Sequence, residues 1–324
     1  MSTPTRVTAL LGALAFAGTV YPAIAADYPE RALTLIVPYP PGASTDSLAR
    51  VTATELGKVL GQSVVVENRP GGETTIATLA AKRAPADGYT LLFQTTGLVQ
   101  ATYALKNPGY EVSDFVPVSG LIKTPFVLMV PSTLPSQSVD EFFAYARQHS
   151  SKLNHGTLGA GPSGYKVMGD AIQRAGKFTW TDIPYKGGME GVQAVMSGQI
   201  HGYFATVSLA VSQQYQPSIR LLAVTDTKRS AYLPNVPTFD ELGYPDLVNA
   251  SHYGIYVRKE VAHPIRVKLE AALRDVMKSE AMKASIASLS LEPFEGSLQD
   301  YKAEVQTAAD KFAADVKRLG LEPK

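Results

Sequence analysis

Short apolar runs alternate with amphipathic stretches along most of the chain. The runs at residues 33–37, 64–67 and 89–93 have the length and the aliphatic, β-branched or aromatic content of strands. Between them, apolar residues recur near every third or fourth position, which predicts helices after residue 44 and over residues 74–84. This alternation is typical of α/β folds with a mainly parallel sheet.

The alternation resumes after residues 126–131, a fully apolar run that predicts a buried strand. Ser138 followed by Glu141 is a capping-box pattern, which predicts a helix from there to about Gln148. The later chain predicts strands at 154–157, 179–183, 200–204, 221–224 and 252–257, and helices at 165–175, 189–196, 264–278 and 298–319. This order predicts two α/β lobes, the second inserted into the first: residues 26–127 and 251–324 form lobe 1, and residues 128–250 form lobe 2.

The composition argues against several classes of protein. With 324 residues, 45% of them hydrophobic, the chain is long enough to bury a large core in two domains. Its 30 Lys and Arg balance 29 Asp and Glu and form no basic block, which argues against a nucleic-acid partner and a polybasic membrane anchor. The sequence contains no cysteine, so disulfides, thiol chemistry and a lipid-bearing cysteine are excluded.

The N-terminal segment is typical of a secretory signal peptide. Arg6 precedes an apolar stretch at residues 7–20, and residues 23–25, Ala-Ile-Ala, have the small side chains of a cleavage site. The apolar stretch is too short for a membrane span. We therefore expect residues 1–25 to be a signal peptide, with an uncleaved anchor as the alternative, and the mature chain to function in a bacterial periplasm without stable membrane insertion.

Three loops share one chemistry: each follows a predicted strand, is rich in glycine or proline with nearby hydroxyl residues, and precedes a predicted helix. They lie at residues 38–46, 158–165 and 184–188. In open α/β sheets such loops gather beyond the carboxyl ends of the strands, where ligands bind. Helix N-termini favour anions, because they present unpaired N–H groups and a positive dipole end. The pattern indicates a carboxylate clamp between the lobes, with ordinary Gly- and Ser-rich turns as the alternative.

Short segments in a fixed order carry a family resemblance. They read YPER at 28–31, VPYPPGASTD at 37–46, VVENRPG at 65–71, ADGYTLL at 86–92, PYKG at 184–187, GQI at 198–200, LAVT at 222–225 and LPNVPT at 233–238. Together they span essentially the whole mature chain and resemble the tripartite tricarboxylate transporter receptor family, the Bug-type periplasmic solute-binding proteins. The resemblance implies a type II-like periplasmic binding protein fold, with two α/β lobes that close over a ligand cleft. It also implies a monomer without enzymatic activity, cofactor or metal, which delivers a small carboxylate to a two-subunit membrane permease.

The resemblance further implies the ligand-binding residues, which in the family hold a carboxylate mainly through backbone donors and ordered water. They are Tyr39, Gly42, Ala43, Ser44, Thr45 and Asp46 in the first loop; Gly161, Ser163, Gly164 and Tyr165 in the second; Tyr185, Lys186, Gly187 and Gly188 in the third; and Thr95, Thr96, Ala205, Thr206 and His252 outside the loops.

Several departures from the family pattern bear on the ligand. Pro41 and Ala43 stiffen and enlarge a loop that usually reads Ala-Gly-Gly, and the family commonly has aspartates where this chain has His201 and Ala205. Losing two carboxylates argues against an amino-acid ligand, whose ammonium group needs an acidic partner. His252, where the family often has an aromatic residue, suits a second carboxylate or an aromatic ring. We therefore expect an aromatic dicarboxylate such as terephthalate or another phthalate isomer, with aliphatic C4–C6 di- or tricarboxylates as the alternative.

Other interpretations of these residues remain open. Asp46 could instead compensate a helix dipole. Lys186 could be an exposed residue at a helix start, and His201 a hydrogen-bonded structural residue. A hydrolase is disfavoured, because residues 161–165, Gly-Pro-Ser-Gly-Tyr, lack the second glycine of a nucleophile elbow, and the chain has no Walker loop or zinc-binding spacing. A receptor that reports its ligand to a periplasmic sensor is the alternative function.

Overall fold

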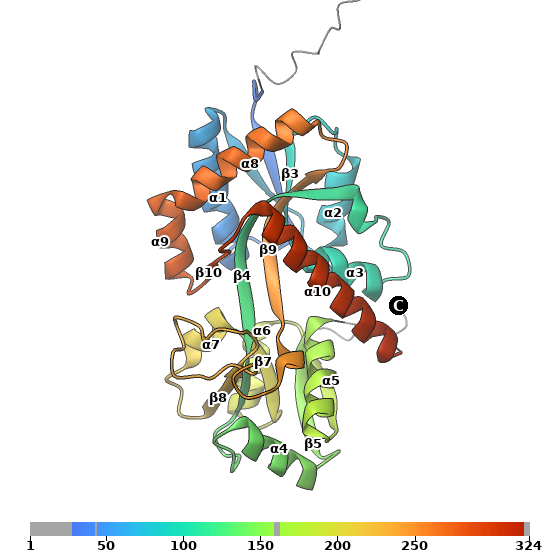
Figure 1. The fold of residues 1–324 in the computed structure, drawn as a ribbon, viewed down its shortest axis with the longest axis vertical. Helices are drawn as coiled ribbons and strands as arrows, with labels where there is room; N and C mark the ends of the chain where they lie inside the picture. Colours follow the sequence, from blue (N-terminus) through green and yellow to red (C-terminus); the bar gives the residue numbers. More distant parts are fainter. Residues whose placement is uncertain (1–27, 43, 159–162, 321–324) are drawn as a thin grey trace, which may run out of the picture.

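Two α/β lobes lie one above the other and are joined by two strands that run between them (Figure 1). The computed structural model describes residues 28–42, 44–158 and 163–320, and the predicted signal peptide lies outside them. The joining strands are β4 (Phe115–Pro131) and β9 (Ala250–Arg258). Within the described ranges, no helix has the length and apolarity needed to cross a bilayer.

Lobe 1 is a three-layer α/β/α unit. Besides β9 and the first part of β4, its elements are β1 (Leu33–Val37), β2 (Val64–Asn68), β3 (Thr90–Thr95), β10 (Glu292–Pro293), α1 (Ser44–Leu60), α2 (Thr75–Arg83), α3 (Gly97–Ala104), the 3-10 helix η1 (Val112–Asp114), α8 (His263–Lys278), α9 (Glu280–Ser288) and α10 (Leu298–Arg318). β1 pairs in parallel with β2 and β3, whereas β9 runs antiparallel to β3 and β4. Helices α1, α8 and α9 cover one face of this sheet, and α2, α3 and α10 cover the other (Figure 1).

The sequence of β1 explains why this sheet is buried on both faces. Leu33, Leu35 and Val37 pack into the core beneath α1 and α8, whereas Ile36 packs into the opposite core with Leu92. Successive side chains of a strand point to opposite faces, so a strand covered on both sides needs apolar residues at nearly every position. The predicted strand at residues 33–37 is confirmed for this reason. The predicted strand at residues 64–67 is confirmed as the edge strand β2, whose Val65 is exposed.

Lobe 2 has the same layered construction. Its elements are β5 (Leu153–Leu158), β6 (Trp180–Tyr185), β7 (Gly202–Thr206), β8 (Ile219–Val224), α4 (Val139–Gln148), α5 (Gly164–Gly176), α6 (Gly188–Met196), α7 (Val207–Gln213) and the 3-10 helix η2 (Pro245–Leu247). β5 pairs in parallel with β6 and β7, and the second part of β4 runs antiparallel to β7 and β8. Phe142 and Phe204 belong to the core on one face, and Val192 and Tyr203 to the core on the other.

β4 passes from one lobe to the other without interruption. Pro125 pairs with Ala250 of β9, and the next residue, Phe126, pairs with Thr206 of β7. The prediction of a strand at 126–131 captured only the lobe 2 half of β4. The other half is paired over a long sequence distance and contains proline, glycine and lysine, so its sequence lacks an apolar run. The expected division of the chain after residues 127 and 250 remains a prediction, which this pairing supports.

Helix α10 links the two lobes on one side of the joining strands (Figure 1). Tyr301 is fully buried against β4 and β9, where a Cβ on Gly254 would lie 2.6 Å from the carbonyl oxygen of Ser119. Near its other end, Lys311 Nζ donates hydrogen bonds to the carbonyl oxygens of Asp246, at 2.8 Å, and Val248, at 2.6 Å. α10 is therefore fixed to the lobe 1 sheet and to the segment that leads from lobe 2 into β9.

Candidate functional site

A cavity of about 300 Å³ lies at the boundary between the lobes, and we call it the cleft cavity. Tyr39 lies just after β1, and Thr95, Leu158 and Thr206 are the last residues of β3, β5 and β7; all four line the cavity. The carboxyl ends of parallel strands from both lobes thus meet at one place, as expected for a ligand site in open α/β sheets.

Two helices, one from each lobe, begin at the cleft cavity. Thr96 and Gly97 start α3, Ser163 and Gly164 start α5, and all four residues line the cavity. Ser163 Oγ accepts a hydrogen bond from the backbone N–H of Lys166 at 3.3 Å, which caps α5. Because the positive dipole ends of both helices reach the same space, the cavity favours an anionic group.

Hydroxyl groups beside these helix ends are held in defined positions. The hydroxyls of Tyr39 and Thr95 are 2.9 Å apart, and Thr95 Oγ1 also accepts the N–H of Gly97 at 3.0 Å. Thr96 Oγ1 lies 3.1 Å from Ser251 Oγ. Burial raises the pKa of Tyr39 far above its ordinary value, so its phenol stays neutral and can donate a hydrogen bond. The site can therefore offer several neutral donors to a carboxylate.

Aromatic rings form much of the remaining wall. Phe126, Tyr165 and Tyr253 line the cavity. The Tyr165 ring lies 5.5 Å from Phe126 in an edge arrangement and 5.9 Å from Tyr203 in a stacked one. These packed rings give the cavity rigid apolar surfaces, suited to an aliphatic chain or an aromatic ring.

Asp46, predicted in the first loop, shapes that loop from outside the cavity. Its carboxylate accepts hydrogen bonds from Gly42 N–H at 2.9 Å, Arg50 Nε at 2.8 Å and Asn68 Nδ2 at 2.7 Å. Burial raises the pKa of Asp46, but the bonds from Arg50, Gly42 and Asn68 outweigh burial and hold it below its ordinary value. Asn68 also donates to the carbonyl oxygen of Tyr39 at 3.0 Å, so this network positions the part of the loop that reaches the cavity.

Three of the other predicted residues of the first loop are not brought to the cavity. Gly42, Ser44 and Thr45 are absent from its lining, and Ala43 lies outside the described residues.

The structure does not bring the third loop to the cleft cavity. Tyr185, Lys186, Gly187 and Gly188 lie at the end of β6 and the start of α6 and are not among the residues that line it. The backbone N–H of Lys186 donates to Glu190 Oε2 at 3.0 Å, within the first turn of α6.

The last two predicted residues to be placed are Ala205 and Gly161. Ala205 is buried in the lobe 2 core, because its neighbour Thr206 takes the strand position that faces the cavity. Gly161, predicted in the second loop, falls outside the described residues.

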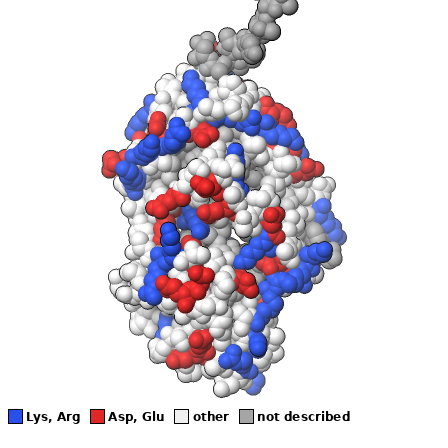
Figure 2. All heavy atoms as spheres, viewed as in Figure 1, with Lys and Arg blue, Asp and Glu red and all other residues white. Residues whose placement is uncertain are grey.

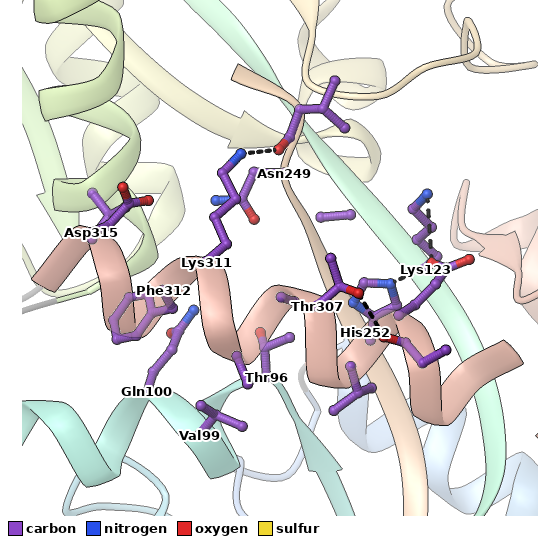
Figure 3. Close-up of a pocket in the computed structure, with 18 residues that line it drawn as sticks. Thr96, Val99, Gln100, Lys123, Asn249, His252, Thr307, Lys311, Phe312 and Asp315 are labelled. Carbon is purple, nitrogen blue, oxygen red and sulfur yellow. Dashed lines mark hydrogen bonds and ion pairs between the residues drawn. The ribbon is translucent and has the colours of Figure 1, made fainter. Parts of the chain in front are cut away.

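His252 lies on the opposite face of β9 from the cleft cavity. Its neighbours Ser251 and Tyr253 line the cleft cavity, and strand alternation turns His252 toward α10. There its Nε2 lies 2.8 Å from Glu304 Oε2, at an adjoining cavity of about 290 Å³ (Figure 3) that shares Thr96, Gln100, Asn249 and Ala250 with the cleft cavity. Burial lowers the pKa of His252, although the Glu304 carboxylate opposes that shift. His252 is thus buried against α10 and is not among the residues that line the cleft cavity.

Sequence reasoning missed several residues of the cavity wall, above all Glu73 and Gln100. Among the described residues that line the cavity, Glu73 alone carries a carboxylate and none is lysine, arginine or histidine. The run of Asn, Arg, Pro and two glycines at residues 68–72 predicts a turn, but it gives no signal that the next residue reaches the cleft. No group of three or more His, Cys, Asp or Glu side chains suited to a metal occurs in the described part of the chain.

Two α/β lobes with a donor-lined cavity between them define the class of two-lobed solute-binding receptors. The chain belongs to one family of that class: a model described as the tripartite tricarboxylate transporter family receptor matches residues 48–321. Protein BugT of Bordetella pertussis strain Tohama I is 30% identical over 324 residues, which cover 99% of each chain. The fold and the family predicted from the sequence are therefore confirmed.

Solved structures agree with this assignment. Rpa4515 of Rhodopseudomonas palustris, solved with adipate, is 30% identical with a TM-score of 0.79, covering 92% of this chain and 100% of that one. The periplasmic binding protein BugD is 28% identical with a TM-score of 0.75 over 92% and 100% of the two chains. MatC from Rhodopseudomonas palustris with bound malate is 26% identical with a TM-score of 0.74, over 89% and 100%.

Proposed function

We propose that the protein is a periplasmic receptor that captures a small carboxylate in the cleft cavity and delivers it to a two-subunit membrane permease. One observation carries the proposal: the N-termini of α3 and α5, from different lobes, reach the same cavity beside the hydroxyls of Thr95 and Ser163. Such donors bind an anion without a cationic side chain. Several charge-assisted bonds make micromolar affinity, about −8 kcal/mol, attainable.

Ligand capture closes the lobes. Closure rotates lobe 2 about the joining strands and carries the third loop, with Lys186 and Gly187, onto the ligand from the opposite side. The permease binds the closed form more tightly than the open one, and this difference in affinity makes delivery depend on the ligand. The receptor works as a monomer.

The ligand class is supported from two directions. The rings of Phe126, Tyr165 and Tyr253 favour the aromatic ring of the dicarboxylate predicted from the sequence, with a phthalate isomer as the example. The similar structures with adipate and malate favour the aliphatic C4–C6 alternative. The second carboxylate of a dicarboxylate would lack its expected partner, because His252 lies against α10.

The charge distribution fits a small-molecule ligand better than a nucleic acid. Basic and acidic side chains both occur over the face shown in Figure 2, and the formal net charge of the whole chain is only +1. The periplasmic location is supported by the similarity to the periplasmic binding protein BugD.

A thermal-shift screen of carboxylates against the mature chain tests the proposal. A carboxylate at about a hundred times its dissociation constant should stabilise the protein by about 2.7 kcal/mol and raise its melting temperature. If amines or sugars raise the melting temperature and no carboxylate does, the proposed anion site is wrong.

The Gly187→Val variant tests whether the third loop contributes to binding, without changing the stability of the unliganded protein. A Cβ at Gly187 meets no atom within 4 Å in this structure, so the unliganded variant should melt like the wild type. Its carboxylate affinity should fall at least tenfold, because the new side chain would enter the closed site. Unchanged affinity would remove the third loop from the site.

A further inference from the structure

Four consecutive residues, the last two of which line the cleft cavity, have left-handed backbone conformations. Gly71, Gly72, Glu73 and Thr74 have φ values of 111°, 58°, 52° and 71°. Glycine adopts this region freely, whereas a side chain strains it, especially the β-branched one of Thr74. Strained non-glycine residues persist where the surrounding structure enforces them, and they cluster at binding sites.

Hydrogen bonds hold this turn in place. The N–H of Thr75 donates to the carbonyl oxygen of Gly72 at 2.9 Å, and Gln94 Nε2 lies 3.2 Å from Thr74 Oγ1. Gln94 is fully buried in β3, so the turn is attached to the sheet directly beneath the cavity. Glu73 is therefore held at the cavity wall by a fixed backbone.

The Glu73 carboxylate has no hydrogen-bond or ion-pair partner among the described residues. Arg69, the nearest arginine along the chain, pairs with Glu67 at 2.6 Å, Arg50 pairs with Asp46 at 2.8 Å, and neither lines the cavity. Among the described residues that line the cavity with Glu73, none is a lysine, arginine or histidine.

The cavity wall consequently carries two opposite electrostatic influences. The N-termini of α3 and α5 favour a negative group. Glu73, an exposed residue of the wall, supplies a negative charge, and its carboxylate contributes, after burial and the neighbouring Tyr253, to the raised pKa of Tyr39. A ligand complementary to both carries a carboxylate and, at a second position, a hydrogen-bond donor, most favourably a cation.

We propose that Glu73 selects carboxylates that carry an ammonium or hydroxyl group at the far end and discriminates against dicarboxylates. The inference rests on the proposed function, because it assumes that a carboxylate binds in the cleft cavity. It also reverses two expectations drawn from the sequence: that the site lacks an acidic partner for an ammonium group, and that the preferred ligand is a dicarboxylate.

Two ligand series of matched shape test the selection by isothermal titration calorimetry. The aromatic series is 4-(aminomethyl)benzoate, 4-(hydroxymethyl)benzoate and terephthalate; the aliphatic series is 6-aminohexanoate, 6-hydroxyhexanoate and adipate. In at least one series, the wild type should bind the ammonium compound about tenfold or more tightly than the dicarboxylate, with the hydroxyl compound between them. The preference should shrink as ionic strength rises from about 0.01 M to about 1 M, since the Debye length falls from ~30 Å to ~3 Å.

Matched variants assign the preference to Glu73. Glu73→Gln keeps the size of the side chain and should reduce the ammonium-to-dicarboxylate affinity ratio at least fivefold, and Glu73→Lys should reverse it. Glu295→Gln, at an exposed glutamate that does not line the cavity, removes the same charge and should leave the ratio unchanged. Glu73→Gly relieves the backbone strain and should abolish the preference while the melting temperature holds or rises.

The outcomes separate this inference from the proposed function. If the wild type binds carboxylates but Glu73→Gln leaves the ratio unchanged, the role of Glu73 is wrong and the proposed function stands. If Glu73→Gln loses affinity equally for all three ligands of a series, the inference about Glu73 is also overturned, since Glu73 would then act in lobe closure and not in ligand selection. If no carboxylate binds the wild type by calorimetry or thermal shift, both proposals fail.

Discussion

Replacing Asp46 with asparagine removes one charge from a network that supports the first loop. The Asp46 carboxylate accepts bonds from Gly42, Arg50 and Asn68 at 2.9, 2.8 and 2.7 Å, and its side chain is 3% exposed. An asparagine that keeps its oxygen toward Gly42 and Arg50 turns its amide hydrogens toward the Asn68 amide, so a bond becomes a donor–donor contact. A lost bond to a charged group amounts to about 1.5–3 kcal/mol. We therefore expect Asp46→Asn to lower the free energy of unfolding by about 2–3 kcal/mol.

Urea unfolding at neutral pH measures this loss, and Asp87→Asn is its matched control. Asp87 also lies 2.8 Å from an arginine, Arg31, but the two side chains are 38% and 62% exposed. Exposed pairs contribute about 0–1 kcal/mol, so the control should lose less than about 1 kcal/mol. Asp46→Asn should also weaken carboxylate binding, because the same network positions Tyr39 at the cavity.

The pH dependence of the Asp46→Asn effect checks its electrostatic origin. The lowered pKa of Asp46 means that its stabilising contribution is present above the unfolded value of about 3.9 and is lost as pH falls through the folded value. The difference between wild type and Asp46→Asn should therefore shrink in acid. A loss no larger than that of Asp87→Asn, or one that persists unchanged in acid, would refute the reasoning.

Three further predictions concern the joining strands and the cavity. Gly254→Ala should lower the free energy of unfolding by about 1–3 kcal/mol in urea, because its methyl group would overlap the buried Tyr301; full stability would contradict this packing. Thr95→Val keeps the side-chain shape but removes the hydroxyl bonded to Tyr39, so calorimetry should show carboxylate affinity reduced about fivefold to tenfold. Because burial lowers the pKa of His252, wild-type stability should fall as pH drops below about 6.5, and urea titrations of His252→Gln should show a shallower fall; equal slopes would rule out this titration.

Local sequence patterns were sufficient for the elements that depend on local chemistry. The capping box at Ser138 and Glu141 predicted α4, where the N–H of Glu141 donates to Ser138 Oγ at 3.3 Å. β1 was predicted because burial on both faces requires an apolar run. The lobe 1 half of β4 was missed, because antiparallel pairing with β9 stabilises a stretch that has no strand pattern of its own.

The site was harder to predict, because it depends on which face each residue presents. His252 and Tyr253 are adjacent, and both faces of β9 are covered, one by the cleft and the other by α10, so the sequence alone does not say which residue faces the ligand. Glu73 follows two glycines whose pattern predicts a turn. Its place at the cavity depends on the attachment of Thr74 to Gln94, a contact that no local rule predicts.

A crystal structure of the mature chain with a bound carboxylate tests the central claim most directly. We predict electron density for the ligand between the lobes, with its carboxylate at the N-termini of α3 and α5 and within hydrogen-bond distance of Thr95 or Ser163. Density in the cavity beside His252 and α10, or outside the cleft altogether, would contradict the account.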